Sequence, residues 1–292
     1  MGTGMIARDE MAARAALAQM LGRDAERAQL ELLRGGTHRR SWLVTATDAS
    51  RLVLRLPVAR SNALLDIATE ARAMEAAARA GVAPAVVAVD AGRGLLLTEY
   101  RESAAWEPHD ARRPANVARL AALLRALHTV PVDLPVFAAE RIAQRYLDAA
   151  PLPAREPNAR RWADEITALA HRYDTQYAPT AFCHNDLVAA NVLDDGGGLA
   201  LVDFEYSVRG SPLLDLANFA AMNGLGADEQ RALLAAYNRD APGAAELTEL
   251  RALVRMARLF AWFWARVGAA DADEPSAYAG YLADLGADLQ RE

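Results

Sequence analysis

The stretch CHNDLVAANVLDDGGGLALVDFEYS, residues 183–207, decides how this chain folds. Two short apolar segments in it flank a run of turn-forming residues, Asp194-Asp195-Gly196-Gly197-Gly198, which predicts a β-hairpin. Asn191 and Asp203 each lie six positions from Gly197. Pairing of the two predicted strands would therefore bring Asn191 and Asp203 side by side.

The polar residues of this stretch suit phosphoryl transfer. The carboxylate of Asp186 can orient or deprotonate an attacking hydroxyl. The amide oxygen of Asn191 and the carboxylate of Asp203 can bind the Mg²⁺ that neutralises charge on the β- and γ-phosphates of ATP. The order His-x-Asp-Leu-x-x-x-Asn, hairpin, Asp-Phe is that of a kinase catalytic loop. The sequence therefore predicts an ATP-dependent kinase with Asp186 as its catalytic residue.

The chain before residue 100 is rich in short strand-like segments. We predict a helix over residues 1–22, a second helix capped by Ser61 or Asn62 that ends before Gly81, and five strands between them and after them. The predicted strands cover residues 29–33, 42–46, 52–56, 85–89 and 94–98. Residues 1–100 should thus form an N-terminal lobe with a small antiparallel sheet and one main helix.

Residues 101–292 are expected to form a larger, mostly helical C-terminal lobe that carries the hairpin. Apolar residues recur with helical spacing in five segments, residues 114–128, 138–148, 159–173, 227–238 and 247–267. The predicted fold class is therefore α+β, in a bilobal arrangement.

Composition excludes several classes of function. The net charge of -6 argues against a nucleic-acid-binding face. No stretch approaches the roughly 18 apolar residues of a membrane span, and no secretory signal is evident, so we expect a cytoplasmic protein with no membrane partner. All 32 basic side chains are arginine, which excludes lysine Schiff-base chemistry and a P-loop lysine. One cysteine and five scattered histidines offer no zinc-ligand spacing.

On these residues the sequence resembles the aminoglycoside phosphotransferase and choline kinase superfamily, small-molecule relatives of the protein kinases. The resemblance spans nearly the whole chain. Asp203-Phe204-Glu205-Tyr206, with the later Asp215-Leu216-Ala217, looks most like the choline and ethanolamine kinase branch. The resemblance implies a two-lobed, protein-kinase-like fold. The segment from Phe204 to Pro212 is too short for a peptide-docking activation segment, so the acceptor should be small.

The resemblance also implies a set of nucleotide-binding residues. Gly35-Gly36-Thr37 resembles the phosphate-covering loop, and Arg55 stands where the family has its nucleotide-binding basic residue. Apolar neighbours on the predicted strand make a charge at Arg55 costly unless it has a partner. Glu70 is the expected partner, with Glu75 as a rival. At the predicted hinge between the two lobes, near Tyr100, the expected nucleotide-binding residues are Glu99 and Tyr100. His184 and Asp215 are expected to support the catalytic loop.

The implied acceptor is a cationic alcohol of the choline or ethanolamine type, because aromatic faces bind such cations. The C-terminal region is rich in aromatic residues, among them Tyr281. The residues expected at the acceptor site are Glu205, Tyr206, Trp262, Trp264 and Tyr278. A place in the hydrophobic core is the alternative for the C-terminal aromatic residues, since helical geometry puts Trp262 and Trp264 on different faces.

Other functions remain open. The same fold could serve a thiamine or aminoglycoside phosphotransferase. A pseudokinase that binds nucleotide and regulates a partner is an alternative from another class, although retention of Asp186, Asn191 and Asp203 argues against it. The expected partner is a small-molecule alcohol, with no nucleic acid, and the sequence makes no prediction of oligomeric state.

Overall fold

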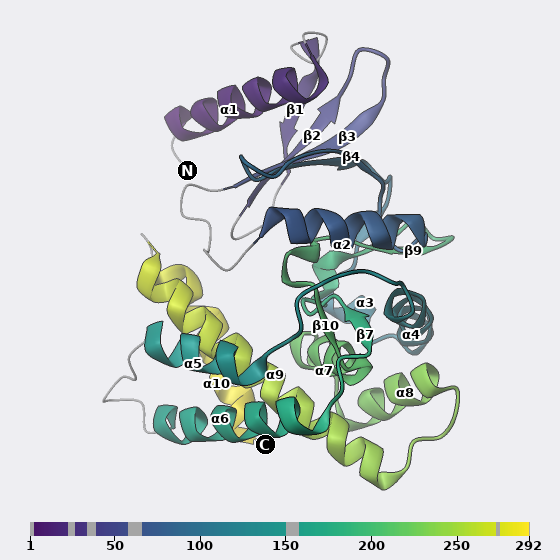
Figure 1. Cartoon of the computed structure of the whole chain (residues 1–292), viewed down its shortest axis with the longest axis vertical. Helices are drawn as coiled ribbons and strands as arrows, with labels where there is room; N and C mark the ends of the chain where they lie inside the picture. Colours follow the sequence, from purple (N-terminus) through teal and green to yellow (C-terminus); the bar gives the residue numbers. More distant parts are fainter. Residues whose placement is uncertain are drawn as a thin grey trace. The chain divides into compact units, whose positions relative to one another are not determined.

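A computed structural model describes residues 3–22, 27–33, 39–57, 66–149, 158–272 and 275–291 (Figure 1). The chain divides into two compact units, each discontinuous in sequence. The first unit consists of Met1–Ala105, Val130–Leu134 and Val192–Ser207. The second consists of Trp106–Thr129, Pro135–Asn191 and Val208–Glu292. Mixed helices and antiparallel strands confirm the predicted α+β class.

The first unit is built on a five-stranded antiparallel sheet with the strand order β1-β2-β3-β5-β4. Its strands are β1 (Gln29–Leu32), β2 (Arg39–Thr45), β3 (Arg51–Pro57), β4 (Val86–Asp90) and β5 (Leu95–Glu99). The β2–β3 turn is closed by Asp48, whose carboxylate accepts the backbone N–H of Ser50 at 2.9 Å. The five strand-like segments of the sequence thus form one sheet.

The two faces of this sheet carry different residues because side chains alternate along a strand. Strand register aligns Trp42, Leu54 and Leu97, and all three are buried in one core cluster with Leu17 of α1 (Thr3–Leu21). Arg55 follows Leu54 and so faces the other way, toward α2 (Ile67–Arg79). Figure 1 shows α1 and α2 on opposite faces of the sheet.

Helix α2 begins later than predicted. Its N-cap is Asp66, whose carboxylate accepts the backbone N–H groups of Ala68 and Thr69 at 3.1 and 3.2 Å. The predicted caps, Ser61 and Asn62, lie outside the described residues, and the start of α2 at Ile67 corrects the prediction, because the Asp66 carboxylate satisfies two of the donors that a helix start leaves open. The predicted stop is confirmed, since Gly81 has a left-handed φ of 73° and the backbone N–H of Val82 bonds back to Ala77.

The predicted hairpin is present, but it belongs to the first unit and not, as expected, to a unit made of residues 101–292. Strands β8 (Val192–Asp194) and β9 (Leu199–Leu201) pair antiparallel, and β6 (Ala104–Ala105) adds a third strand. Asp195 closes the turn by accepting the N–H groups of Gly197 and Gly198 at 2.9 and 2.7 Å. A hydrogen bond from Arg101 is the main cause that lowers the pKa of Asp195 to about 2. After the hairpin, the short helix η3 (Phe204–Tyr206) packs on α2.

The second unit is mainly helical. Its helices are α3 (Pro108–Ala111), α4 (Pro114–His128), α5 (Ala139–Ala149), α6 (Ala159–Gln176), η2 (Ala189–Asn191), α7 (Pro212–Met222), α8 (Ala227–Asn238), α9 (Ala244–Asp271), η4 (Pro275–Tyr278) and α10 (Ala279–Arg291). Strands β7 (Ala181–Cys183) and β10 (Val208–Gly210) pair antiparallel. The bounds of α4 and α8 match the prediction, whereas α9 is longer than predicted at both ends.

Helix α7 lies in the interior of the second unit. Leu216 and Phe219 have no exposed surface, and α7 packs along α9. Burial of most of its residues explains why its sequence is largely apolar. Among the described helices, none is long and apolar enough to cross a bilayer.

Candidate active site

In the first unit, three charged residues meet at the centre of β3. The guanidinium of Arg55 donates to Glu70 Oε1 at 2.6 Å and to Asp203 Oδ1 at 2.5 Å. The Arg55 side chain is 11% exposed and that of Glu70 is 1% exposed. Burial lowers the pKa of Arg55, but the nearby charges of Asp203 and Glu70 outweigh it, so the pKa lies above its ordinary value. The predicted pair between the sheet and the helix is therefore present.

Local structure explains why Glu70, and not Glu75, pairs with Arg55. The Asp66 cap starts α2 so that Glu70 falls in the first helical turn, on the buried face. Glu75 lies on the exposed face of the same helix. A carboxylate in the first turn is also favoured by the helix dipole.

Asp203 adopts a rare backbone conformation. Its φ of 68° and ψ of 63° are left-handed, which for a residue other than glycine costs about 1–3 kcal/mol unless the surroundings fix it. Phe204, the next residue, is fully buried, and η3 packs on α2. This packing and the contact with Arg55 hold the Asp203 carboxylate on the first unit. Such strained residues gather at functional sites.

In the second unit, the predicted catalytic-loop segment is folded around Asp186 and Asn191. The Asn191 amide nitrogen donates to the backbone oxygen of Asp186 at 2.9 Å and to its carboxylate at 3.1 Å. Asn191 is 8% exposed, and its position is fixed by η2. Because the amide nitrogen is bonded to Asp186, the Asn191 oxygen is the atom left to meet a cation.

Asp215 supports this loop from α7. Its carboxylate accepts the backbone N–H groups of His184 and Asn185, both at 2.8 Å. His184 has no exposed surface, and its Nδ1 accepts the N–H of Asp186 at 3.3 Å. Asn185 has a φ of 61°, a left-handed conformation that asparagine tolerates better than most residues. These bonds fix the backbone on both sides of Asp186.

Sequence reasoning missed three further supports of the loop. The imidazole of His128 on α4 hydrogen-bonds Asp215 at 3.1 Å. Asn218 accepts the N–H of Leu187 at 2.6 Å, and Asn223 accepts that of Ala189 at 2.8 Å. Asn218 lies on α7 and Asn223 directly follows it, in the same segment as Asp215. This position could have indicated that the two asparagines support the loop.

His128, Cys183 and Asp215 form a buried cluster whose possible ligand atoms all lie within 4.8 Å of one another. Burial raises the pKa of the Cys183 thiol well above its ordinary value, so the thiolate that would bind a metal is disfavoured. The thiol contacts the backbone oxygen of Ser211 at 3.3 Å, and the Asp215 carboxylate already accepts several hydrogen bonds. We interpret the cluster as a structural support of the loop.

Three aromatic residues of the second unit, Trp264, Tyr278 and Tyr281, lie together. The ring of Trp264 is 5.9 Å from that of Tyr278 and 6.3 Å from that of Tyr281, between ring centroids. Burial, and then the charge of Asp186, raise the pKa of Tyr281 to about 12. Tyr281 is still 39% exposed, so this group is not sealed in the core.

Trp262 lies elsewhere. It is 2% exposed and packs edge-on against Trp162 and Phe263, with the guanidinium of Arg266 over its ring at 5.0 Å. Positions 262 and 264 are about 200° apart around a helix, which separates a core residue from a partly exposed one. Of the two tryptophans, Trp264 is therefore the one grouped with Tyr278 and Tyr281.

Several other predicted residues belong to the first unit. Glu99 is the last residue of β5 and Tyr100 follows it, and the guanidinium of Arg51 lies 4.0 Å from the centre of the Tyr100 ring. Glu205 and Tyr206 lie in η3, and the charge of Glu205 contributes to the raised pKa of Arg55. Gly35, Gly36 and Thr37 lie outside the described residues.

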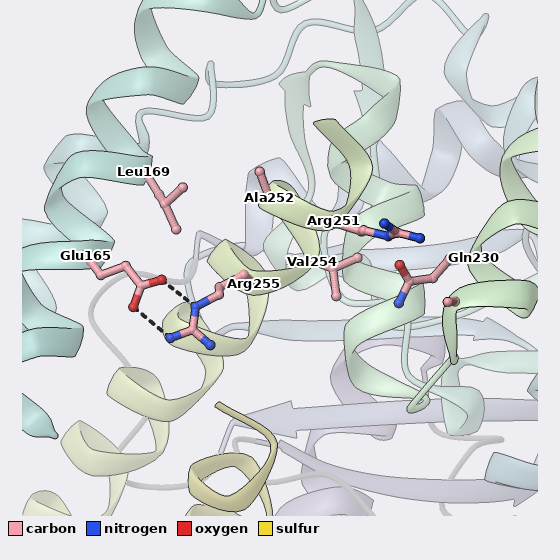
Figure 2. A pocket seen from close by; sticks show the side chains of 8 residues that line it. Glu165, Leu169, Gln230, Arg251, Ala252, Val254 and Arg255 are labelled. Carbon is pink, nitrogen blue, oxygen red and sulfur yellow. Dashed lines mark hydrogen bonds and ion pairs between the residues drawn. The ribbon is translucent and has the colours of Figure 1, made fainter. Parts of the chain in front are cut away.

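A pocket in the second unit contains none of the predicted site residues (Figure 2). It has a volume of about 520 Å³ and is lined by residues of α6, α8 and α9. Glu165 and Arg255 join two of these helices through a pair of hydrogen bonds, drawn as dashed lines in Figure 2. This ion pair fastens α6 to α9.

Comparison with known proteins identifies the family of this chain. Residues 29–253 match the phosphotransferase enzyme family. Ethanolamine kinase 2 of Mus musculus is 25% identical over 186 residues, which cover 59% of this chain and 48% of the mouse protein. The human protein of the same name is 26% identical over 142 residues, covering 44% and 37%. The chain thus spans about half or less of these curated relatives.

Solved structures extend the likeness to almost the whole chain. A choline/ethanolamine kinase family protein from Mesorhizobium loti is 27% identical, with a TM-score of 0.80 and 97% of each chain covered. Choline kinase LicA from Streptococcus pneumoniae is 16% identical, with a TM-score of 0.77, 98% of this chain and 100% of that chain covered, and shares the fold. Since the family match covers most of the chain, this protein belongs to the phosphotransferase enzyme family.

Proposed function

We propose that this protein is an ATP-dependent kinase that transfers the γ-phosphate to the hydroxyl of a small cationic alcohol of the choline or ethanolamine type. The observation that carries the proposal is the surroundings of Asp186. Its carboxylate is oriented by Asn191 at 3.1 Å, and its charge acts on Tyr281, a partly exposed member of an aromatic group. A carboxylate beside aromatic rings suits an acceptor with a hydroxyl at one end and a cation at the other.

At the acceptor, Asp186 accepts the hydroxyl proton or directs the oxygen lone pair toward the phosphorus. Trp264, Tyr278 and Tyr281 supply the aromatic faces for the cation. Trp262 is left out of this set, because it is packed in the core. Glu205 and Tyr206 remain proposed acceptor contacts, argued from the resemblance alone.

At the nucleotide, Arg55 binds phosphate oxygens, and Glu70 orients its guanidinium. Asn191 and Asp203 offer hard oxygen donors, which fit Mg²⁺. When bound, Mg²⁺ would neutralise phosphate charge. Glu99 and Tyr100, at the end of β5, would contact the nucleotide, and residues 35–37 would cover its phosphates. His184 and Asp215 keep the Asp186 backbone in place.

The names of the similar proteins support this choice of acceptor. Three curated matches are ethanolamine kinases, and similar structures include choline kinases. A structure of LicA contains AMP. Macrolide and aminoglycoside phosphotransferases share the fold at lower similarity, so antibiotics belong in any test of the acceptor.

The experiment is a measurement of ADP release over a panel of choline, ethanolamine, thiamine, homoserine and aminoglycosides, with the Asp186→Ala variant as control. We expect release that depends on choline or ethanolamine and on Mg²⁺, and that the variant abolishes. A preference for thiamine or an aminoglycoside would correct the acceptor. Nucleotide binding without release for any alcohol would favour a pseudokinase and contradict the proposal.

A further inference from the structure

A glycine on α9 lies unusually close to an aromatic ring. A Cβ atom added to Gly268 would come within 2.7 Å of Tyr278 Cζ and within 2.8 Å of its Cε1 and hydroxyl oxygen. Side-chain carbons do not approach one another so closely. Tyr278 can therefore lie on the backbone of α9 only because residue 268 has no side chain.

Tyr278 is one end of a row of three rings whose other end is Tyr281. It packs against Trp264, Trp264 packs against Tyr281, and the charge of Asp186 acts on Tyr281. The ring contacts are edge-on, with interplanar angles of 65° and 88°. Tyr281 is held separately by a contact from its hydroxyl to Met222 Sδ at 3.5 Å. Displacement of Tyr278 would thus change the support of Trp264 while leaving Tyr281 attached to α7.

We propose that Gly268 is a positioning residue for the acceptor site. By seating Tyr278 on α9, it sets where the rings of Tyr278 and Trp264 stand and so how closely the site fits the cationic group. The inference rests on the proposed function, because it assigns these rings to the acceptor. Gly268 itself contacts no substrate, and its influence passes through Tyr278.

The substitution Gly268→Ala should move Tyr278 without unfolding the protein. The colliding atoms are at the far end of a side chain that can rotate, and alanine is a better helix former than glycine. We expect the acceptor KM to rise about tenfold, the size of effect that loss of one aromatic contact to a cation produces. The KM for ATP should stay unchanged, since the proposal assigns Tyr278 to the acceptor and not to the nucleotide.

The chain offers a matched control. A Cβ added to Gly286 on α10 would meet Trp162 and Trp262 at 3.7 and 3.8 Å, which is ordinary contact. Gly286→Ala should therefore leave both KM values unchanged. A second background, Tyr278→Leu, removes the ring with which the new Cβ collides. If Gly268 acts through Tyr278, Gly268→Ala should have no further effect on the acceptor KM in that background.

The test is steady-state kinetics of wild type, Gly268→Ala, Gly286→Ala, Tyr278→Leu and the Gly268→Ala/Tyr278→Leu double variant, with choline and ethanolamine as acceptors. A rise in acceptor KM for Gly268→Ala that vanishes in the Tyr278→Leu background supports the inference. An unchanged KM, or an equal rise in that background, overturns the inference but leaves the proposed function standing. A wild type that is inactive with both amino alcohols overturns the proposed function and this inference with it.

Discussion

Arg55 and Asp203 are 148 positions apart in the chain, yet the guanidinium of Arg55 donates to the carboxylate of Asp203 at 2.5 Å. The same guanidinium holds Glu70 at 2.6 Å. A strand, a helix and the segment after the hairpin are thus joined by one arginine. Arginine stays charged at any physiological pH, so the positive charge at this junction does not change with pH.

Changing Arg55 to Met keeps the apolar stem and deletes the charge. We expect the KM for ATP to rise at least about tenfold, with a smaller change for the acceptor, because the proposed contact of Arg55 with phosphate is lost. Breaking a buried pair also costs about 3–5 kcal/mol of stability, so unfolding by urea must be measured beside the kinetics. Arg55→Lys keeps the charge without the planar fork, so its KM for ATP should lie between those of the wild type and Arg55→Met.

Glu70→Gln should give a weaker form of the same defect, and Glu75→Gln, on the exposed face of α2, should have none. If both residues act through one contact, the Arg55→Met/Glu70→Gln variant will be less impaired than the product of the two single defects. Strict additivity, or normal ATP kinetics for Arg55→Met, would mean that other groups anchor the nucleotide.

Asp203→Asn should raise the Mg²⁺ concentration needed for half-maximal rate about tenfold or more, since it replaces a charged oxygen ligand by a neutral one. The acceptor KM should change little. The measurement is a Mg²⁺ titration at fixed ATP. Asp195→Asn, in the hairpin turn, is the matched control and should leave the titration unchanged. An Asp203→Asn protein with a normal titration would assign the metal to other residues.

Asp215→Asn should destabilise the second unit. The two carboxylate oxygens accept separate backbone N–H groups, so an amide would turn one acceptor into a donor that faces a donor. We expect a loss of about 1–3 kcal/mol in the free energy of unfolding, the cost of one buried unsatisfied group. Urea denaturation measures it, with exposed Asp133→Asn as control. Equal stability of the two variants would show that the Asp215 contacts do not hold the loop.

Two variants of Tyr281 separate its ring from its hydroxyl. Tyr281→Phe loses the contact with Met222 Sδ but keeps the aromatic face, so the acceptor KM should change less than about threefold. Tyr281→Leu loses the face and should raise the acceptor KM about tenfold. Acceptor titrations at saturating ATP decide between them. If Tyr281→Phe raises the acceptor KM as much as Tyr281→Leu does, the acceptor site needs the hydroxyl and not the ring.

Much of the fold could be predicted from local sequence patterns. The turn at Asp194 to Gly198 needs left-handed backbone and short side chains, and the chain places Gly196 there with a φ of 82°. Helices α4 and α8 were found to the residue because proline at the start of α4 and the acidic first turn of α8 mark their beginnings. The start of α2 was misplaced, because Ser61, Asn62 and Asp66 are all competent caps and sequence alone does not rank them.

Contacts between distant segments could not be predicted in the same way. His128 lies 87 positions before Asp215, and nothing in its helix distinguishes it from a core histidine. The role of Gly268 also depends on Tyr278, and their close approach is visible only in the folded chain. Arg55 and Glu70 were paired from the resemblance, whereas the further contact of Arg55 with Asp203 required the structure.

The central claim is that Asp186 is the catalytic carboxylate of a small-molecule kinase, and the turnover number of Asp186→Ala tests it most directly. The loss of a group that positions and deprotonates the acceptor should lower kcat by about 10²–10⁴-fold. The dissociation constant for ATP and the unfolding midpoint should remain close to those of the wild type. A variant that keeps near-wild-type turnover with choline or ethanolamine would contradict the account.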